Sequence, residues 1–315
     1  MRLYAHADRH GEDRIGVLTE DGLYTGGRLA STGRAWPLAT YQSVCCLLAD
    51  DDWRRGFERM TRAARRRGPG RRTIDRRARP AVSHPEKVVC VGLNYREHAA
   101  EGGREAPSRP LLFGKFANAI VADGEPVIRP EGTHALDFEV ELGVVIGKTA
   151  RRVDTAAAMD HVAGYVVVND VSARDWQGNP QALREGEKGD GQWLRAKGSD
   201  TFLPMGPVFV TPDEVDPRAG LRLRSWRITP DGTDHLMQDG NTRDLIWDVP
   251  ALVAFISKAI TLYPGDVIAT GTPSGVGVFR DPPVFLEPGD RVRCEVEGIG
   301  RVENPVIDWT EDATT

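Results

Sequence analysis

Carboxylates alternate with apolar residues in the middle of this chain, just before a long apolar stretch. Residues 137–142 read Asp-Phe-Glu-Val-Glu-Leu. Successive side chains of a strand point to opposite faces, so Asp137, Glu139 and Glu141 would share one face. The strand continues through 144–146 as Val-Val-Ile, a run typical of a strand buried on both faces. Buried carboxylates repel one another and lose hydration, and a hard cation would relieve both penalties.

A second apolar run also ends in a carboxylate. Residues 166–171 read Val-Val-Val-Asn-Asp-Val, with Asp170 near the end. Three carboxylate ligands suit Mg²⁺, Mn²⁺ or Ca²⁺, whereas zinc favours His or Cys. The simpler interpretation is a charged strand face exposed to solvent. Two strands alone do not establish that Glu139, Glu141 and Asp170 meet in space.

His98 and Glu101 are spaced to act as a general base and the residue that orients it. The strand predicted at 87–93 is followed by Asn-Tyr-Arg-Glu-His-Ala-Ala-Glu at 94–101. Residues three apart on a helical turn share a face, so Glu101 would orient the His98 imidazole. Such a pair is a minimal general-base arrangement. Taken alone, His98 is more typical of a surface histidine in an incidental ion pair.

Two further segments carry groups suited to an anionic substrate. Lys197 follows Gln-Trp-Leu-Arg-Ala at 192–196, and residues 271–277 read Gly-Thr-Pro-Ser-Gly-Val-Gly after a predicted strand. A glycine-rich turn of this kind offers backbone N–H groups and hydroxyls to an anion. The alternatives are a surface lysine and an ordinary wide turn. The spacing fits neither a Walker A loop nor a dinucleotide-binding fingerprint.

The remaining pattern predicts a mainly β fold. Short strands are predicted at residues 87–93, 140–146, 164–171, 206–211, 221–228, 266–270 and 291–296. One convincing helix is predicted from Trp247 to Tyr263, from its apolar stripe. A single good helix among many strands excludes the regular alternation of Rossmann and TIM-barrel folds.

The first 80 residues form a separate compositional unit. A small hairpin is predicted around Glu20-Asp21, and a helix from Tyr41 to Arg67. Residues 54–79 contain twelve arginines against only Glu58 and Asp75. A site for nucleic acid or for another acidic partner is one interpretation of this segment. The net charge of −5 and a glycine–proline break at 68–70 favour a solvated helix face and linker, so we expect no nucleic-acid partner.

The chain shows no signal for a membrane. No stretch approaches the roughly 18 uncharged apolar residues of a spanning helix, and the first residues lack the apolar run of a signal peptide. We therefore expect a cytoplasmic protein with no membrane partner.

Taken together, the segments between about residues 85 and 308 resemble the fumarylacetoacetate hydrolase family. Six motifs stand in the expected order, and the combination is more specific than any one of them. They lie at residues 91–98, 137–142, 164–177, 197–199, 264–277 and 298–305.

The resemblance implies a fold and a site. The fold would be mixed but mainly β: a β-roll of several sheets around a metal site in residues 81–315, with a small, variable N-terminal α+β domain in residues 1–80. The resemblance implies a homodimer. It implies that Glu139, Glu141 and Asp170 are ligands of Mg²⁺ or Mn²⁺, with Ca²⁺ as a further option. It also implies a lid that carries His98 and Glu101. The expected contacts to substrate are Arg174, Gln177, Thr272 and Tyr95.

The implied reaction is cleavage of a C–C bond in a β-diketo acid, such as an acylpyruvate or a fumarylacetoacetate-like substrate. His98, oriented by Glu101, would activate water, the metal would stabilise the departing enolate, and Lys197 would offset its charge. The alternatives are an oxaloacetate-type decarboxylase, an isomerase, or a dehydratase of a sugar-derived 2-oxo acid. The His98–Glu101 pair favours hydrolysis, because enolate chemistry alone needs no base aimed at water.

Two local features depart from the family pattern. Residues 178–191 form a long polar insertion that we expect to make a flap near the pocket. Residues 102–107 contain two glycines and a proline, so we expect no stable helix there without ligand.

Overall fold

The computed structural model describes residues 77–311 without a break. Of the first 76 residues it describes 1–8, 10–20, 22–25, 43–48, 53, 55, 58, 59, 61, 62 and 66. Most of the helix predicted from Tyr41 to Arg67, and most of the arginine-rich segment, lie outside the described residues. Within that predicted helix, α2 (Val44–Leu48) is described.

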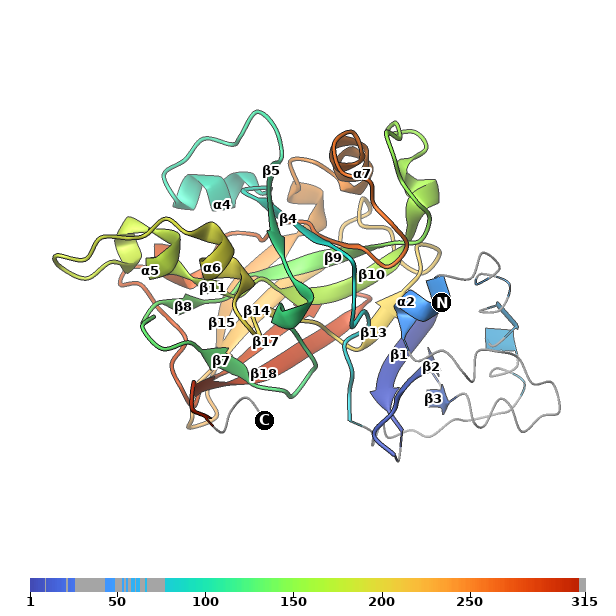
Figure 1. Cartoon of the computed structure of the whole chain (residues 1–315), viewed down its shortest axis with the longest axis horizontal. Helices are drawn as coiled ribbons and strands as arrows, with labels where there is room; N and C mark the ends of the chain where they lie inside the picture. Colours follow the sequence, from blue (N-terminus) through green and yellow to red (C-terminus); the bar gives the residue numbers. More distant parts are fainter. Residues whose placement is uncertain are drawn as a thin grey trace.

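A nine-stranded sheet runs through the described part of the chain (Figure 1). Its central strands pair antiparallel, except that β16 and β4 run parallel. In spatial order the strands are β3 (Gly22–Thr25), β2 (Asp13–Thr19), β1 (Arg2–Ala7), β13 (Val208–Val210), β10 (Val162–Asn169), β9 (Val140–Ile146), β16 (Val267–Ala269), β4 (Val88–Gly92) and β5 (Leu111–Lys115).

A five-stranded sheet packs against the first, with β14 and β17 over β9 and with β17 and β18 over β10. Two short strand pairs complete the described β structure. The five strands are β15 (Asp234–Asn241), β14 (Arg222–Ile228), β17 (Arg291–Val296), β18 (Gly300–Asp308) and β7 (Val127–Arg129). The pairs are β11 (Ser172–Ala173) with β8 (Leu136–Asp137), and β12 (Leu203–Pro204) with β6 (Ile120–Val121).

Helices are few and short in the described residues, as the mainly β prediction requires. Within residues 77–311 the longest is α7 (Val249–Ser257), which begins at the cap Asp248 and ends six residues before the predicted end. The others are α4 (Arg96–Glu101), α5 (Arg174–Gln177) and α6 (Trp193–Gly198), with short 3₁₀ turns η2 (Ala117–Ala119), η3 (Ala158–His161), η4 (Pro180–Ala182), η5 (Thr242–Asp244) and η6 (Gly277–Phe279).

The apolar runs explain why β9 and β10 are central. All seven residues of β9 and all eight of β10 are buried, because each strand has a neighbour on both edges and the second sheet over one face. β9 and β17 have the predicted bounds. The mainly β fold of several sheets is therefore confirmed.

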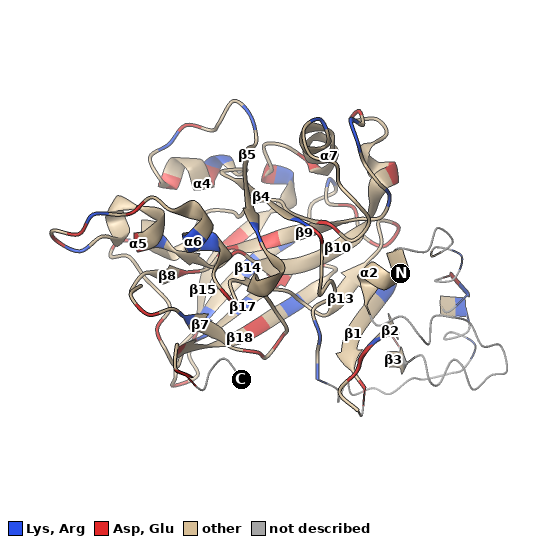
Figure 2. Ribbon diagram, viewed as in Figure 1, with Lys and Arg blue, Asp and Glu red and all other residues tan. Residues whose placement is uncertain are grey.

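The N-terminal residues join this core through the sheet. The predicted hairpin is present as β2 and β3, and β1 pairs antiparallel with β13. The sheet thus crosses the boundary proposed near residue 80. Basic and acidic residues are interspersed along the described elements (Figure 2). None of the helices in the described residues is both long and apolar enough to cross a membrane.

Candidate active site

The carboxylates predicted to bind a metal lie together near the start of β9. The antiparallel pairing of β9 with β10 sets Glu141 opposite Val168. The backbone N–H of Asp170 donates to the carbonyl of Glu139 at 2.9 Å, which brings Asp170 alongside. One carboxylate oxygen of each of Glu139, Glu141 and Asp170 lies within 4.8 Å of the other two. The two strands therefore bring the three side chains together, and their role as metal ligands stays a prediction.

Two basic side chains contact this cluster. Lys197 Nζ lies 2.8 Å from Glu139 Oε2 and 2.9 Å from Asp170 Oδ2. Arg174 pairs with Asp137 at 2.9 Å and with Glu139 at 2.5 Å. Burial by itself would raise the pKa of Glu139, but Lys197 and Arg174 bring that pKa well below its usual range.

Glu141 is held differently from Glu139. It is 1% exposed, and it accepts one hydrogen bond, from the Gly271 backbone N–H at 2.8 Å. Across the described residues it has no ion pair. Burial, together with the charges of Asp170 and Glu139, raises the pKa of Glu141 well above its usual value. A divalent cation would supply the missing positive charge, and an all-oxygen donor set suits Mg²⁺, Mn²⁺ or Ca²⁺. The residues present therefore fit such an ion.

Lys115 is a buried cation that the sequence analysis missed. Its Nζ lies 2.8 Å from Asp170 Oδ1. It also donates to the carbonyls of Val171 at 3.0 Å, Phe202 at 2.7 Å and Lys197. The available signal was weak: Lys115 ends an apolar strand, as Asp170 nearly does, but a lysine at a strand end is usually a surface residue. Lys115 fixes Asp170 and the end of α6 from behind the pocket.

The predicted pair of His98 and Glu101 forms on α4. His98 Nδ1 lies 2.7 Å from Glu101 Oε1, and the Gly275 backbone N–H donates to Glu101 Oε2 at 2.8 Å. The His98 ring also packs against Phe279, with 6.0 Å between centroids. His98 is 6% exposed and lines the pocket. The imidazole is therefore oriented by a carboxylate that is itself held in place.

The glycine-rich loop at 271–278 binds anions, and the anions it binds are the protein's own carboxylates. Besides the bonds to Glu141 and Glu101, the N–H groups of Gly277 and Val278 donate to Asp137 at 2.8 and 3.1 Å. This is the nest of N–H groups that the sequence predicts. Its described donors position the site's acidic residues.

Thr272 and Tyr95, both predicted to contact substrate, have different surroundings. Thr272 lines the pocket, but its hydroxyl donates to the Val140 carbonyl at 2.9 Å and accepts from Gln238 at 2.7 Å. Tyr95 is 2% exposed and is not among the pocket-lining residues. Burial, followed by the nearby charge of Glu141, raises the pKa of Tyr95. The structure does not bring Tyr95 to the pocket wall.

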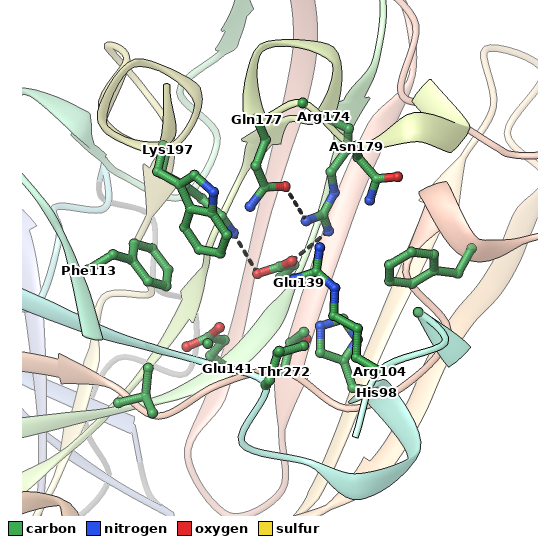
Figure 3. Close-up of a pocket in the computed structure, with 17 residues that line it drawn as sticks. His98, Arg104, Phe113, Glu139, Glu141, Arg174, Gln177, Asn179, Lys197 and Thr272 are labelled. Atoms are coloured by element: carbon green, nitrogen blue, oxygen red, sulfur yellow. Dashed lines mark hydrogen bonds and ion pairs between the residues drawn. The ribbon is translucent and has the colours of Figure 1, made fainter. Parts of the chain in front are cut away.

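A pocket of about 680 Å³, including its open mouth, unites most of the predicted residues (Figure 3). Arg174 and Gln177 line it, joined by a 3.1 Å hydrogen bond from Arg174 Nη1 to Gln177 Oε1. Sequence reasoning missed several lining side chains, because they come from loops or carry no recognisable motif: Arg104, Phe113, Asn179, Trp193 and Phe279. Asn179 belongs to the 178–191 insertion, which therefore does reach the pocket.

Fold and site together define a class of protein: a mainly β protein with a buried carboxylate cluster able to hold a divalent cation, and an oriented histidine that lines the same pocket as Glu139 and Glu141. The model of the fumarylacetoacetate (FAA) hydrolase C-terminal domain matches residues 87–307. The chain belongs to the fumarylacetoacetate hydrolase family, a family of enzymes that act on small molecules.

Relatives of known name come from this family. The chain is 46% identical over 226 residues to the mitochondrial oxaloacetate tautomerase FAHD2A of Homo sapiens, covering 72% of this chain and 68% of that protein. It is 45% identical over 226 residues to the corresponding tautomerase of Xenopus laevis, covering 72% and 67%.

Solved structures agree with this assignment over almost the whole chain. A fumarylacetoacetate hydrolase from Exiguobacterium antarcticum has a TM-score of 0.78 and 33% identity, covering 98% of this chain and all of that one. A 2-hydroxyhepta-2,4-diene-1,7-dioate isomerase from Mycobacterium marinum has a TM-score of 0.66 and 34% identity, covering 99% and 100%. Neighbours of similar fold thus carry the names of a hydrolase and an isomerase.

Proposed function

We propose that this enzyme interconverts the keto and enol forms of a 2-oxo acid, and that oxaloacetate is the first substrate to test. The observation that carries the proposal is that the oriented imidazole of His98 lines the same pocket as Glu139 and Glu141, two members of the three-carboxylate cluster. The names of the two tautomerases, at 45–46% identity, support the choice of substrate. C–C hydrolysis, which the sequence pattern favours, becomes the second candidate.

His98 would move the proton. When Nδ1 donates to Glu101, Nε2 is the ring nitrogen that accepts a proton from carbon 3 of the substrate. Protonation of the 2-oxo oxygen completes the enol, and the reverse steps regenerate the ketone. A divalent cation held by Glu139, Glu141 and Asp170 would supply positive charge to the oxygen that becomes negative.

The other pocket residues would position substrate and limit side reactions. Lys197 and Arg174 neutralise Glu139, so the cluster can face an anionic substrate without a large excess of negative charge. Phe113 and Trp193 pack edge to face, with centroids 5.5 Å apart. Their rings make part of the wall apolar and exclude water there.

Hydrolysis of a β-diketo acid is the second candidate, because the same imidazole, oriented by Glu101, is also arranged to accept a proton from water. In that reaction water adds to the distal carbonyl, the C–C bond breaks, and two acids leave after the enolate is protonated. Similarity to the Exiguobacterium antarcticum hydrolase supports it. Decarboxylation of oxaloacetate would use the same enolate without a base aimed at water.

The test is an assay with added Mg²⁺ or Mn²⁺ on oxaloacetate and on acetylpyruvate, following enol absorbance and identifying products by NMR. We expect faster keto–enol exchange of oxaloacetate without loss of carbon, and inhibition by EDTA. Acid products from acetylpyruvate would instead establish the hydrolase, and pyruvate with CO₂ from oxaloacetate the decarboxylase. No effect on either compound would overturn the proposal.

We also propose the homodimer and the cytoplasmic location that the sequence analysis predicts. Light scattering of the purified protein tests the first, and fractionation of cells that produce it tests the second.

A further inference from the structure

Arg104 reaches the pocket because α4 ends in a tight glycine turn. Gly103 has a φ of +65°, a left-handed conformation that glycine adopts without strain. The Gly103 N–H donates to the Ala100 carbonyl, and the Arg104 N–H donates to the Ala99 carbonyl, both at 2.9 Å. These bonds satisfy carbonyls at the end of the helix and turn the chain back. Arg104 therefore follows α4 at a defined position.

The turn after α4 also packs against Phe279, which lines the pocket. A Cβ added at Gly102 would lie 2.9 Å from the Phe279 ring, so glycine allows α4 to sit directly on that ring. Figure 3 shows the Arg104 side chain extending over the pocket beside His98, toward Glu139. Arg104 is exposed at the mouth, unlike the buried Arg174 and Lys197.

Arg104 differs from the other basic residues of the pocket in its carboxylate partners. Arg174 pairs with Asp137 and Glu139, and Lys197 pairs with Glu139 and Asp170. Arg104 also lines the pocket, yet its guanidinium has no carboxylate partner within the residues that the structure describes. A guanidinium is always charged and presents a planar set of donors that matches a carboxylate.

We propose that Arg104 is a specificity-determining residue that binds a second, distal carboxylate of the substrate. The proposal rests on the function proposed above, in which the 2-oxo acid end of the substrate lies at Glu139, Glu141 and Asp170. The distal carboxylate would then point toward the mouth. Asn179 assists there, because its side-chain oxygen accepts from the Gln181 N–H at 3.1 Å and its amide NH₂ remains as a donor. The pocket thus selects 2-oxo diacids over 2-oxo monoacids.

The experiment compares two acids that differ only at the tail. 2-Oxoglutarate and 2-oxopentanoate have the same 2-oxo acid end and the same number of carbons, with a carboxylate in one where the other has a methyl group. Binding of each to the Mn²⁺-loaded protein is measured by calorimetry, so no turnover is needed. We expect the wild type to bind 2-oxoglutarate at least about tenfold more tightly, the effect of one charged hydrogen-bonded contact.

Arg104→Met should remove this preference and leave 2-oxopentanoate binding unchanged. Arg104→Lys should restore part of it, because the charge is retained without the fork of donors. The matched control is Arg109→Met: Arg109 is exposed on the same segment and does not line the pocket, so the preference should persist.

Three results would overturn the proposal: equal binding of both acids to the wild type, equal weakening of both by Arg104→Met, or loss of the preference in Arg109→Met. Selective binding without turnover of oxaloacetate would contradict the proposed reaction while supporting Arg104. If neither acid binds the Mn²⁺-loaded protein, the placement of the 2-oxo acid end is wrong as well.

Discussion

At the buried end of the pocket, Glu139, Glu141 and Asp170 lie on or beside central strands. Their carboxylates are shielded from solvent and contact backbone N–H groups and basic side chains. At the tail end, Arg104 and Asn179 come from connecting segments and are at least partly exposed. Displacing a side chain in the first region would leave a buried charge uncompensated, at a large cost in free energy. The second can change without disturbing the core. In the proposed function, the chemistry is therefore tied to the fold, and the choice of substrate to the connecting segments.

The largest effect on cation binding is expected when a carboxylate at the buried end is replaced. Glu141→Gln keeps the shape of the side chain but removes a charged ligand. We expect the Mn²⁺ dissociation constant to rise by at least about 100-fold, with activity lost. Calorimetric titration with Mn²⁺ and circular dichroism measure binding and fold. Native Mn²⁺ affinity in the variant would show that Glu141 is not a ligand.

The same variant has a second expected effect, on the stability of the cation-free protein. Because burial raises the pKa of Glu141 in the fold, the fold favours the protonated form. That contribution is present at low pH and is lost as the pH rises through the raised pKa. Glutamine stays neutral, so in EDTA the melting temperature of Glu141→Gln should exceed that of wild type by an amount that grows with pH. A pH-independent difference would contradict this account.

Removing the proposed base should abolish chemistry and spare the cation. His98→Ala should lower kcat by about 10²- to 10⁴-fold, the usual contribution of a general base, while Mn²⁺ affinity stays within a few-fold of wild type. His161→Ala is the control, since the His161 imidazole bonds only the Lys148 carbonyl in the described structure and lies outside the pocket. Retained turnover in His98→Ala would assign the proton transfer to another residue.

Replacing Lys115 tests whether the stability of the buried end depends on the buried ammonium group of this residue. Lys115→Met keeps the approximate volume but leaves three carbonyls and Asp170 without their ammonium. We expect a loss of about 3–5 kcal/mol in unfolding free energy in urea. Lys148→Met, at an exposed lysine with no ion pair in the described residues, should change it by less than about 0.5 kcal/mol. Equal effects would mean that Lys115 has no special role.

The smallest effect is expected at the tail end. Asn179→Ala should raise KM for oxaloacetate by a few-fold, the effect of one neutral hydrogen bond, without changing Mn²⁺ affinity. Gln181→Ala, at an exposed neighbour outside the pocket lining, should change neither. A large loss of Mn²⁺ affinity in Asn179→Ala would contradict the separation between the two ends.

Much of the fold was predictable because it depends on local pattern. Apolar runs and alternation located β9 and β17 to the residue. The end of α7 was predicted six residues too late, since residues 258–260 continue the apolar pattern while the chain already turns toward Pro264. Periodicity reports which face is buried, and it does not report where a helix must stop to meet its neighbour.

In the candidate site, too, some features were predictable from the sequence and others were not. The alternating carboxylates, the spacing of His98 and Glu101, and the glycine-rich loop were visible as motifs. The loop's partners were not, because the bonds from Gly271, Gly275 and Gly277 to Glu141, Glu101 and Asp137 join segments that lie far apart in the chain.

The sequence by itself determined the family, the mainly β class and the residues able to perform chemistry, because these follow from side-chain type and spacing. Only the tertiary structure decided that Asp170 joins Glu139 and Glu141, that Lys115 lies behind them, and that Arg104 and Asn179 reach the pocket while Tyr95 does not. The physical reason is that pairing of β9 with β10 and the docking of α4 on Phe279 are long-range contacts. No local pattern encodes which distant surfaces will meet.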